Sequence, residues 1–237
     1  MKKITLLFVA VAVGWIAGTL LPVPLFKGGA APLPIASAPF VSSASPSSLP
    51  SLLEGVPDVR QSTGYTCGAS ALQAVLAYWG TEEREDRLAA RLRSTPEAGT
   101  HPLDIVRVAR EFGLTADLRE GLEISDLEAT LAAGTTVIVD LQAWRDSADL
   151  PWTETWDDGH YMVLLGMDGE NLYFEDPSLL GSRGTIPRSE FVDRWHDYEG
   201  DPPLDPTDRK YVRMAIFLRG SRPAPTAPSP FSRVYFP

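Results

Sequence analysis

The sequence predicts an α+β fold in which an N-terminal layer of helices packs on a mostly antiparallel sheet. Apolar residues recur at helical spacing between residues 67 and 134, whereas from Thr136 onward they fall in short runs rich in β-branched and aromatic residues. Twelve of the 21 prolines lie in residues 22–50 and 223–237, which confines the folded part to residues 53–220. A domain of about 165 residues can bury one sizeable hydrophobic core.

Four helices are expected in the first half of this domain, over residues 67–80, 81–93, 100–113 and 125–134. Each has apolar residues on one face, such as Leu72 and Val75 in the first helix. A glycine ends the first, third and fourth helices, as is common at helix C-termini. The segment Ser125-Asp126-Leu127-Glu128 matches a capping box, which would open the fourth helix.

Strands are expected in the second half, over residues 136–141, 160–167, 172–175 and 211–218, with a short helix over 189–195. The first of these runs reads TVIVDL and is rich in β-branched residues. Asp168-Gly169 is a turn signal between the second and third strands. A connection this short joins antiparallel neighbours, because parallel strands need a longer crossover.

The first 26 residues are predicted to be a targeting segment. Lys2 and Lys3 precede an uncharged, mostly apolar stretch over residues 4–26, which is typical of a secretory signal or an N-terminal membrane anchor. Residues 4–21 alone make 18 residues, near the length that spans a bilayer, and Pro39 follows the best cleavage site at residues 36–38. An uncleaved anchor is therefore slightly favoured, and in both cases the domain is expected outside the cytoplasmic membrane, periplasmic or secreted.

The segments on either side of the domain are predicted to be disordered. Residues 27–52 form a linker of Pro, Ser, Ala and Gly with few large apolar side chains, and residues 221–237 are similarly rich in proline. Such segments bury too little apolar surface to offset the entropy lost on ordering.

Composition excludes several classes of function. The chain has 31 acidic residues against 21 basic ones and a formal net charge of −10, so a nucleic-acid partner is not expected. A single cysteine excludes an intrachain disulfide and a structural zinc site, which usually takes four closely spaced Cys and His ligands. No metal or organic cofactor is predicted.

The single cysteine, Cys67, carries the strongest indication of chemistry. A lone cysteine is more often a small buried apolar residue. Here Gly64 and Gly68 flank it, which would let backbone approach closely on both sides. The expected helix start at Cys67 offers free N–H groups and a positive dipole end, and both favour a thiolate. Gln61, six residues ahead, could supply an amide donor to an oxyanion hole.

A thiolate nucleophile needs a base, and the chain contains three histidines. His101 precedes a predicted helix start and is expected at the surface or near the helix cap. His196 follows a short charged helix and is expected at the surface. His160 opens a strand directly after a glycine, from where it can point across a cleft at a helix start. His160 is therefore the predicted base.

The imidazole of His160 also needs an acceptor that orients it. Asp176 ends the strand that pairs with the His160 strand, and Pro177 stops the ladder there. A hairpin turning at residues 168–169 would bring the two together, since they are about equally distant from the turn. Asp157 and Asp158 are weaker candidates for the same role.

These residues together resemble the papain-like cysteine peptidases of the bacteriocin-processing, double-glycine leader type. The resemblance rests on Gln61, Cys67-Gly68, Gly159-His160 and Asp176-Pro177, and it spans residues 56–218. It implies the papain-like peptidase fold, with Cys67 as nucleophile, His160 as base and acid, Asp176 as orienter and Gln61 as oxyanion donor. Typical leader peptidases are cytoplasmic domains fused to a transporter. Because this domain is expected outside the membrane, the resemblance does not imply that it cleaves after a Gly-Gly leader.

The expected function is hydrolysis of peptide bonds in a peptide or protein substrate. One alternative is a non-catalytic peptide-binding domain of the same fold, which the presence of all four site residues argues against. Another is different amide chemistry, such as cell-wall peptide hydrolysis. Asp176 mildly disfavours it, because cell-wall enzymes of this fold often carry another polar residue or a histidine in that place. The sequence predicts no oligomeric state.

Three tryptophans lie in the loop that leads to His160. They are Trp144, Trp152 and Trp156. Packing inside the domain is the simpler expectation for them, and a wall of the substrate groove is the alternative.

Overall fold

The computed structural model describes residues 53, 55–179, 181, 183–200, 203–221 and 223. The predicted targeting segment (1–26), the linker (27–52) and the tail (221–237), apart from two of its residues, lie outside this part of the chain. Within the described part, no helix combines the length and apolar character needed to cross a membrane.

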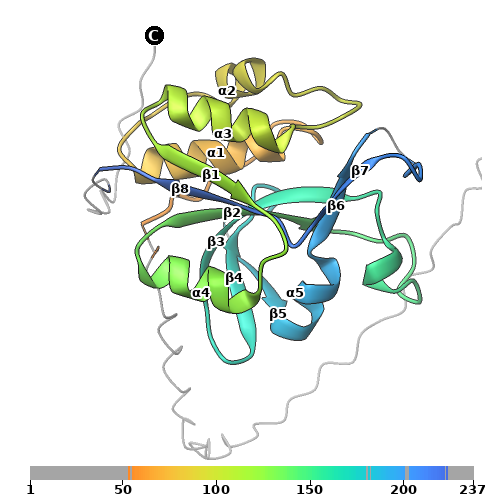
Figure 1. The fold of residues 1–237 in the computed structure, drawn as a ribbon. Coiled ribbons are helices and arrows are strands. Elements are labelled where there is room, and N and C mark those ends of the chain that lie inside the picture. The colour runs from red at the N-terminus through yellow and green to blue at the C-terminus, as the bar shows by residue number, and fades with distance from the viewer. Residues whose placement is uncertain are drawn as a thin grey trace, which may run out of the picture. The chain divides into compact units, whose positions relative to one another are not determined.

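Helices cover both faces of a central sheet (Figure 1). On one face lie α1 (Cys67–Tyr78), α2 (Glu85–Leu92) and α3 (Pro102–Glu111). On the other lie α4 (Ile124–Ala132) and α5 (Arg188–Arg194). The predicted α+β class and the N-terminal helical layer are confirmed, but α4 does not join that layer.

Among the described residues, the central sheet has six strands in the order β1-β8-β2-β3-β4-β5, and all the pairs are antiparallel. The strands are β1 (Thr115–Arg119), β2 (Thr136–Gln142), β3 (Gly159–Met167), β4 (Asn171–Glu175), β5 (Gly184–Pro187) and β8 (Ala215–Arg219). A separate two-stranded sheet pairs β6 (His196–Glu199) with β7 (Arg209–Val212). The short 3-10 helix η1 (Trp152–Glu154) lies in the loop before β3.

The predicted helix positions are close to those observed. The core-facing residues Leu72 and Val75 of α1 are fully buried. Gly80 and Gly113, expected as helix stops, have positive φ angles of 86° and 83°, a conformation that favours glycine at helix ends. The capping box of α4 is formed by Glu123 and Asp126 instead of Ser125 and Glu128, so the helix begins earlier than predicted.

The strand prediction was wrong at the end of the domain. Residues 211–218 form parts of two strands, β7 and β8, in two different sheets. Arg213, between them, has a left-handed φ of 51°, and its N–H donates to the carbonyl of Trp195 at 2.8 Å. β1, β5 and β6 were not predicted, because each is only four or five residues long.

Candidate active site

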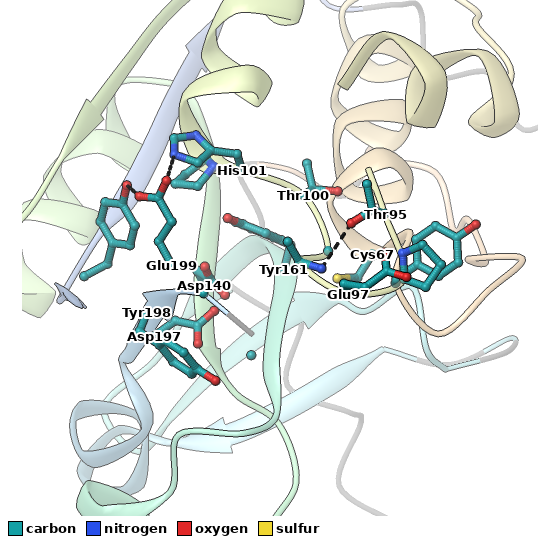
Figure 2. Close-up of a pocket in the computed structure, with 18 of the residues that line it drawn as sticks. Cys67, Thr95, Glu97, Thr100, His101, Asp140, Tyr161, Asp197, Tyr198 and Glu199 are labelled. Atoms are coloured by element: carbon teal, nitrogen blue, oxygen red, sulfur yellow. Dashed lines mark hydrogen bonds and ion pairs between the residues drawn. The ribbon is translucent and has the colours of Figure 1, made fainter. Parts of the chain in front are cut away.

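Cys67 is the first residue of α1 and lines a cavity of about 520 Å³ (Figure 2). Its side chain is largely buried, with 7% of the residue exposed. The preceding residue, Thr66, makes no side-chain cap to the helix. The first-turn N–H groups are therefore not occupied by that cap, and the N–H of Gly68 donates to the Cys67 sulfur.

The two glycines beside Cys67 have different roles. A Cβ on Gly68 would lie 2.8 Å from the Cβ of Thr100, a closer approach than side chains make. Gly68 therefore allows the start of α1 to pack against the loop before α3, which forms one wall of the cavity. The expectation that Gly64 serves a similar close approach was wrong, because a Cβ there would meet nothing within 4 Å.

The β3–β4 hairpin brings His160 and Asp176 together, as predicted. Val163 pairs with Glu175 across the hairpin, which places His160 and Asp176 at its open end. The His160 Nε2 lies 2.7 Å from the Asp176 Oδ1. The same oxygen accepts from the backbone N–H and the hydroxyl of Ser178, at 2.8 and 2.7 Å.

The other orienting candidates take different positions. The carbonyl of Asp158 accepts from the N–H of Ala143 at 2.9 Å, while Asp157 is exposed and lines the cavity. The ring nitrogen Nε2 of His160 is engaged with Asp176, so Nδ1 is the nitrogen left to face Cys67.

At this site, burial and the contacts between the side chains have opposing effects on the pKa values of Cys67 and His160. Burial raises the pKa of the Cys67 thiol, but the hydrogen bond and the charge of His160 outweigh it and lower the pKa from 9.0. Backbone N–H groups of Tyr161 and Gly68 act in the same direction. Burial lowers the pKa of His160, but Asp176 and Cys67 overcome that effect and raise it to about 9. The lowered pKa of the thiol and the raised pKa of the imidazole both favour a thiolate–imidazolium pair over the neutral pair.

Asp176 is the third charge in this chain of contacts. Although burial raises the pKa of its carboxyl, the hydrogen bond and the charge of His160 lower it overall, with Ser178 acting in the same direction. The carboxylate is therefore ionised beside the imidazolium at neutral pH, and it holds the ring in one orientation.

Gln61 lies in the loop that precedes α1, and this loop is tied to the segment after β4. The backbone N–H of Gln61 donates to the carbonyl of Pro177 at 3.0 Å, and that of Val59 donates to Glu175 Oε1 at 3.1 Å. The Gln61 side-chain N–H group donates to the carbonyl of Thr63 at 2.8 Å. Its Oε1 is buried and has no hydrogen-bond partner among the described residues. Because the bond to Thr63 uses one of the two amide hydrogens, the other is left for a further acceptor.

The loop before β3 places tryptophans beside the site. Trp144 is half exposed, and its ring centroid lies 5.0 Å from that of His160. Trp156 lines the same cavity as Cys67 and stands 4.2 Å from the ring of His196. Two of the three tryptophans thus border the site, as a substrate-groove wall would require. Trp152 instead contacts the guanidinium groups of Arg145 and Arg194, whose central carbons lie 4.5 and 4.2 Å from its ring centroid.

Of the two remaining histidines, one lies where it was expected and the other does not. His101 is the N-cap of α3 and accepts from the N–H of Leu103, as expected for a residue near a cap. The expectation that His196 is a surface residue was wrong. His196 is the first residue of β6, is 7% exposed, and its Nε2 lies 2.7 Å from the carbonyl oxygen of Thr155.

Two carboxyl groups in the same cavity were not identified from the sequence. Asp140 lies on the fully buried strand β2 and Asp197 on β6, and both line the cavity with Cys67 (Figure 2). The signal that could have identified Asp140 is the acid in the otherwise apolar run TVIVDL, because a buried carboxyl needs a specific reason to be there. Asp197 has no comparable signal, since β6 was not predicted.

Solved structures share this fold. The peptidase domain of Streptococcus ComA, a bifunctional ABC transporter involved in quorum sensing, is 19% identical, with a TM-score of 0.51. The match covers 68% of this chain and 96% of that one. A Bacillus anthracis protein assigned to the C39-like peptidases is also 19% identical, with a TM-score of 0.54. That match covers 73% of this chain and 98% of the other.

Sequence comparison identifies the family. An uncharacterized protein of Methanothermobacter marburgensis is 33% identical over 122 residues, which is 51% of this chain and 71% of the relative. Another from Methanothermobacter thermautotrophicus is 30% identical over 133 residues, or 56% and 78% of the two chains. The model of the Peptidase_C39 like family matches residues 53–202. The chain belongs to the Peptidase_C39 like family and has the papain-like fold of the C39 peptidase domains.

Proposed function

We propose that the protein is a cysteine peptidase in which Cys67 is the nucleophile, His160 the base and acid, and Asp176 the group that orients His160. The observation that carries the proposal is the continuous chain of contacts from Cys67 through His160 to Asp176. The charges of these groups favour a thiolate–imidazolium pair at the N-terminus of α1. Such a pair is the activated state of a cysteine nucleophile.

The proposed reaction is acyl transfer. The Cys67 thiolate attacks the carbonyl carbon of a peptide bond, and the negative charge moves to the carbonyl oxygen. The first-turn N–H groups of α1 and the Gln61 amide donate to that oxygen. The imidazolium of His160 gives its proton to the leaving amine, which breaks the C–N bond. Water, deprotonated by His160, then attacks the thioester and releases the carboxylate product and the thiol.

We further propose that the reaction takes place outside the cytoplasmic membrane, on a peptide or protein. This part rests on Lys2 and Lys3 followed by the apolar stretch over residues 4–26. The chain belongs to a family of peptidases, which supports a peptide substrate.

The proposal is tested by the pH dependence of alkylation. Since Cys67 is the only cysteine, all iodoacetamide labelling of the protein reports on it. We expect the midpoint of the rate profile to lie below the 9.0 of an ordinary thiol. In His160→Ala we expect the midpoint to move upward, because burial remains and the hydrogen bond and positive charge are lost. A wild-type midpoint at or above 9.0 would contradict the thiolate–imidazolium pair.

A second test concerns Gln61. Replacing it by alanine is expected to lower kcat by about 10²–10³-fold, the effect of removing one oxyanion donor. Because the role is hydrogen-bond donation, the alkylation midpoint of Cys67 is expected to change far less than kcat. If the rate of Cys67 alkylation falls by the same factor as kcat, Gln61 instead supports the thiolate itself. The measurement needs only the two rates on the same preparation.

A further inference from the structure

The cavity beside Cys67 is predominantly acidic. The carboxyl groups that line it outnumber the basic side chains, which are Arg93 and His101. The acids are Glu97, Asp140, Asp157, Asp197 and Glu199. His101 is already engaged, because its Nε2 lies 2.7 Å from Glu199 Oε1. The cavity therefore carries negative charge that its own basic residues do not balance.

Asp140 is the buried member of this group. It is 3% exposed in the middle of β2, opposite Tyr161 on β3. Its Oδ1 is buried without a hydrogen-bond partner, although the Tyr161 hydroxyl donates to the carboxyl group. An unsatisfied buried carboxyl oxygen is costly. Within the described residues the Asp140 carboxyl group is hydrogen-bonded to Tyr161 and to Asp197, and Oδ1 is the oxygen that remains without a donor.

Asp197 approaches the same place from β6. Gln142 Nε2 donates to its Oδ1 at 3.1 Å. On the other side, the absence of a side chain at Gly159 is required, because a Cβ there would lie 2.1 Å from Asp197 Oδ2. The glycine before His160 therefore allows a carboxyl group to lie directly against the backbone beside the site. The Asp197 carboxyl is positioned by these contacts.

The two carboxyl groups perturb each other. Burial, the charge of Asp197 and the charge of Cys67 raise the pKa of Asp140 well above its ordinary value. Burial raises the pKa of Asp197 to about 6. The pair therefore holds a proton more strongly than an ordinary carboxyl group does, and the hydrogen bond between the two carboxyl groups accommodates it. A cation between the carboxyl groups would replace the proton and supply donors to Asp140 Oδ1.

We propose that Asp140 and Asp197 form a subsite for the cationic side chain, lysine or arginine, of a substrate residue close to the scissile bond. As a specificity site it rests on the peptidase function proposed above. The cavity volume of about 520 Å³ accommodates a long side chain together with its backbone. Tyr161, Tyr211 and Trp156 also line the cavity, and aromatic walls suit an aliphatic stem that ends in a cation.

The subsite is tested by binding in the Cys67→Ala protein, where no hydrolysis is required. The probes are Nα-acetyl-lysine N-methylamide and Nα-acetyl-norleucine N-methylamide, which differ chiefly in the terminal ammonium. We expect the lysine probe to bind at least about tenfold more tightly in NMR titrations, as a charge-assisted contact implies. Equal affinity for the two probes, or no detectable binding of the lysine probe, would overturn the proposal.

Substitutions then assign the effect to the pair. Asp140→Asn and Asp197→Asn, each in the Cys67→Ala background, are expected to abolish the preference for the lysine probe. Asp149→Asn is the matched control, because Asp149 is exposed and does not line the cavity. Selectivity that survives in both cavity variants would overturn the assignment. The comparison of the two probes remains decisive if a variant does not fold.

Hydrolysis provides a separate readout. A peptide library cleaved by the wild-type protein is expected to show enrichment of lysine and arginine at one position near the cut, which Asp197→Asn removes. Cleavage without any basic preference would refute the subsite and leave the peptidase function standing. If the wild-type protein cleaves no peptide while the Cys67→Ala protein still prefers the lysine probe, the peptidase proposal fails and the cation site stands.

Discussion

Replacing Cys67 by alanine is expected to abolish hydrolysis. The variant lacks the atom that forms the acyl-enzyme, so only binding and the oxyanion donors remain. Loss of the nucleophile in a comparable serine enzyme lowers kcat by about 10⁶-fold. The measurement is a proteomic cleavage profile, in which new N-termini generated by the wild-type protein are compared with those generated by Cys67→Ala.

Two controls make this result interpretable. Cys67 is small and lies at the start of α1, so alanine is expected to change the free energy of unfolding by no more than about 1–2 kcal/mol. Thermal unfolding of both proteins checks that. Cys67→Ser keeps a hydroxyl in place of the thiol and is expected to be inactive as well, because an alcohol beside His160 is not ionised. Cleavage products shared by wild type and Cys67→Ala would mean that another nucleophile is at work.

Replacing His160 by alanine is the second change with a large expected effect. It removes both the base and the proton donor for the leaving amine, so we expect a loss in kcat of about 10⁴-fold or more. Asp176 is left as a partly buried carboxylate without its main partner, and the pKa of Asp176 is expected to rise. The loss is measured on any peptide found in the cleavage profile.

The wild-type pH profile provides the complementary observation. The rate is expected to rise as Cys67 loses its proton, at a pH below the ordinary thiol value of 9.0. It is expected to fall as the imidazolium of His160 loses its proton, at a pH of about 9. In Asp176→Ala the upper limb should move to lower pH, because the hydrogen bond and charge that raise the pKa of His160 are gone. An upper limb that does not move would contradict the orienting role of Asp176.

The helices could be predicted because their information is local. Apolar spacing around Leu72 and stops such as Gly80 depend on a few neighbouring residues, and these positions agree with the structure. The short strands depend on distant partners instead. Residues 211–218 divide into two strands at the left-handed turn of Arg213. The N–H of Arg213 donates to the carbonyl of Trp195 at this turn. No local pattern in the alternating sequence indicates this turn.

The candidate site was predictable where chemistry and topology coincide. A single cysteine at a helix start is visible in the sequence, and a hairpin brings residues equidistant from its turn together, which placed His160 beside Asp176. The acidic pair was not predictable in the same way. Asp140 and Asp197 lie far apart in the sequence and on different sheets. They meet only because β6 lies against the central sheet.

The sequence alone determined the α+β class, the order of the helices and the main strands, and the four residues on which the peptidase proposal rests. These depend on periodicity, on helix and turn signals and on the rarity of cysteine and histidine. The tertiary structure decided which face α4 covers, how the last strands divide, and which carboxyl groups share the cavity with Cys67. Those outcomes depend on packing and on electrostatic interactions between distant segments, because burial and charge proximity exist only once the chain has folded.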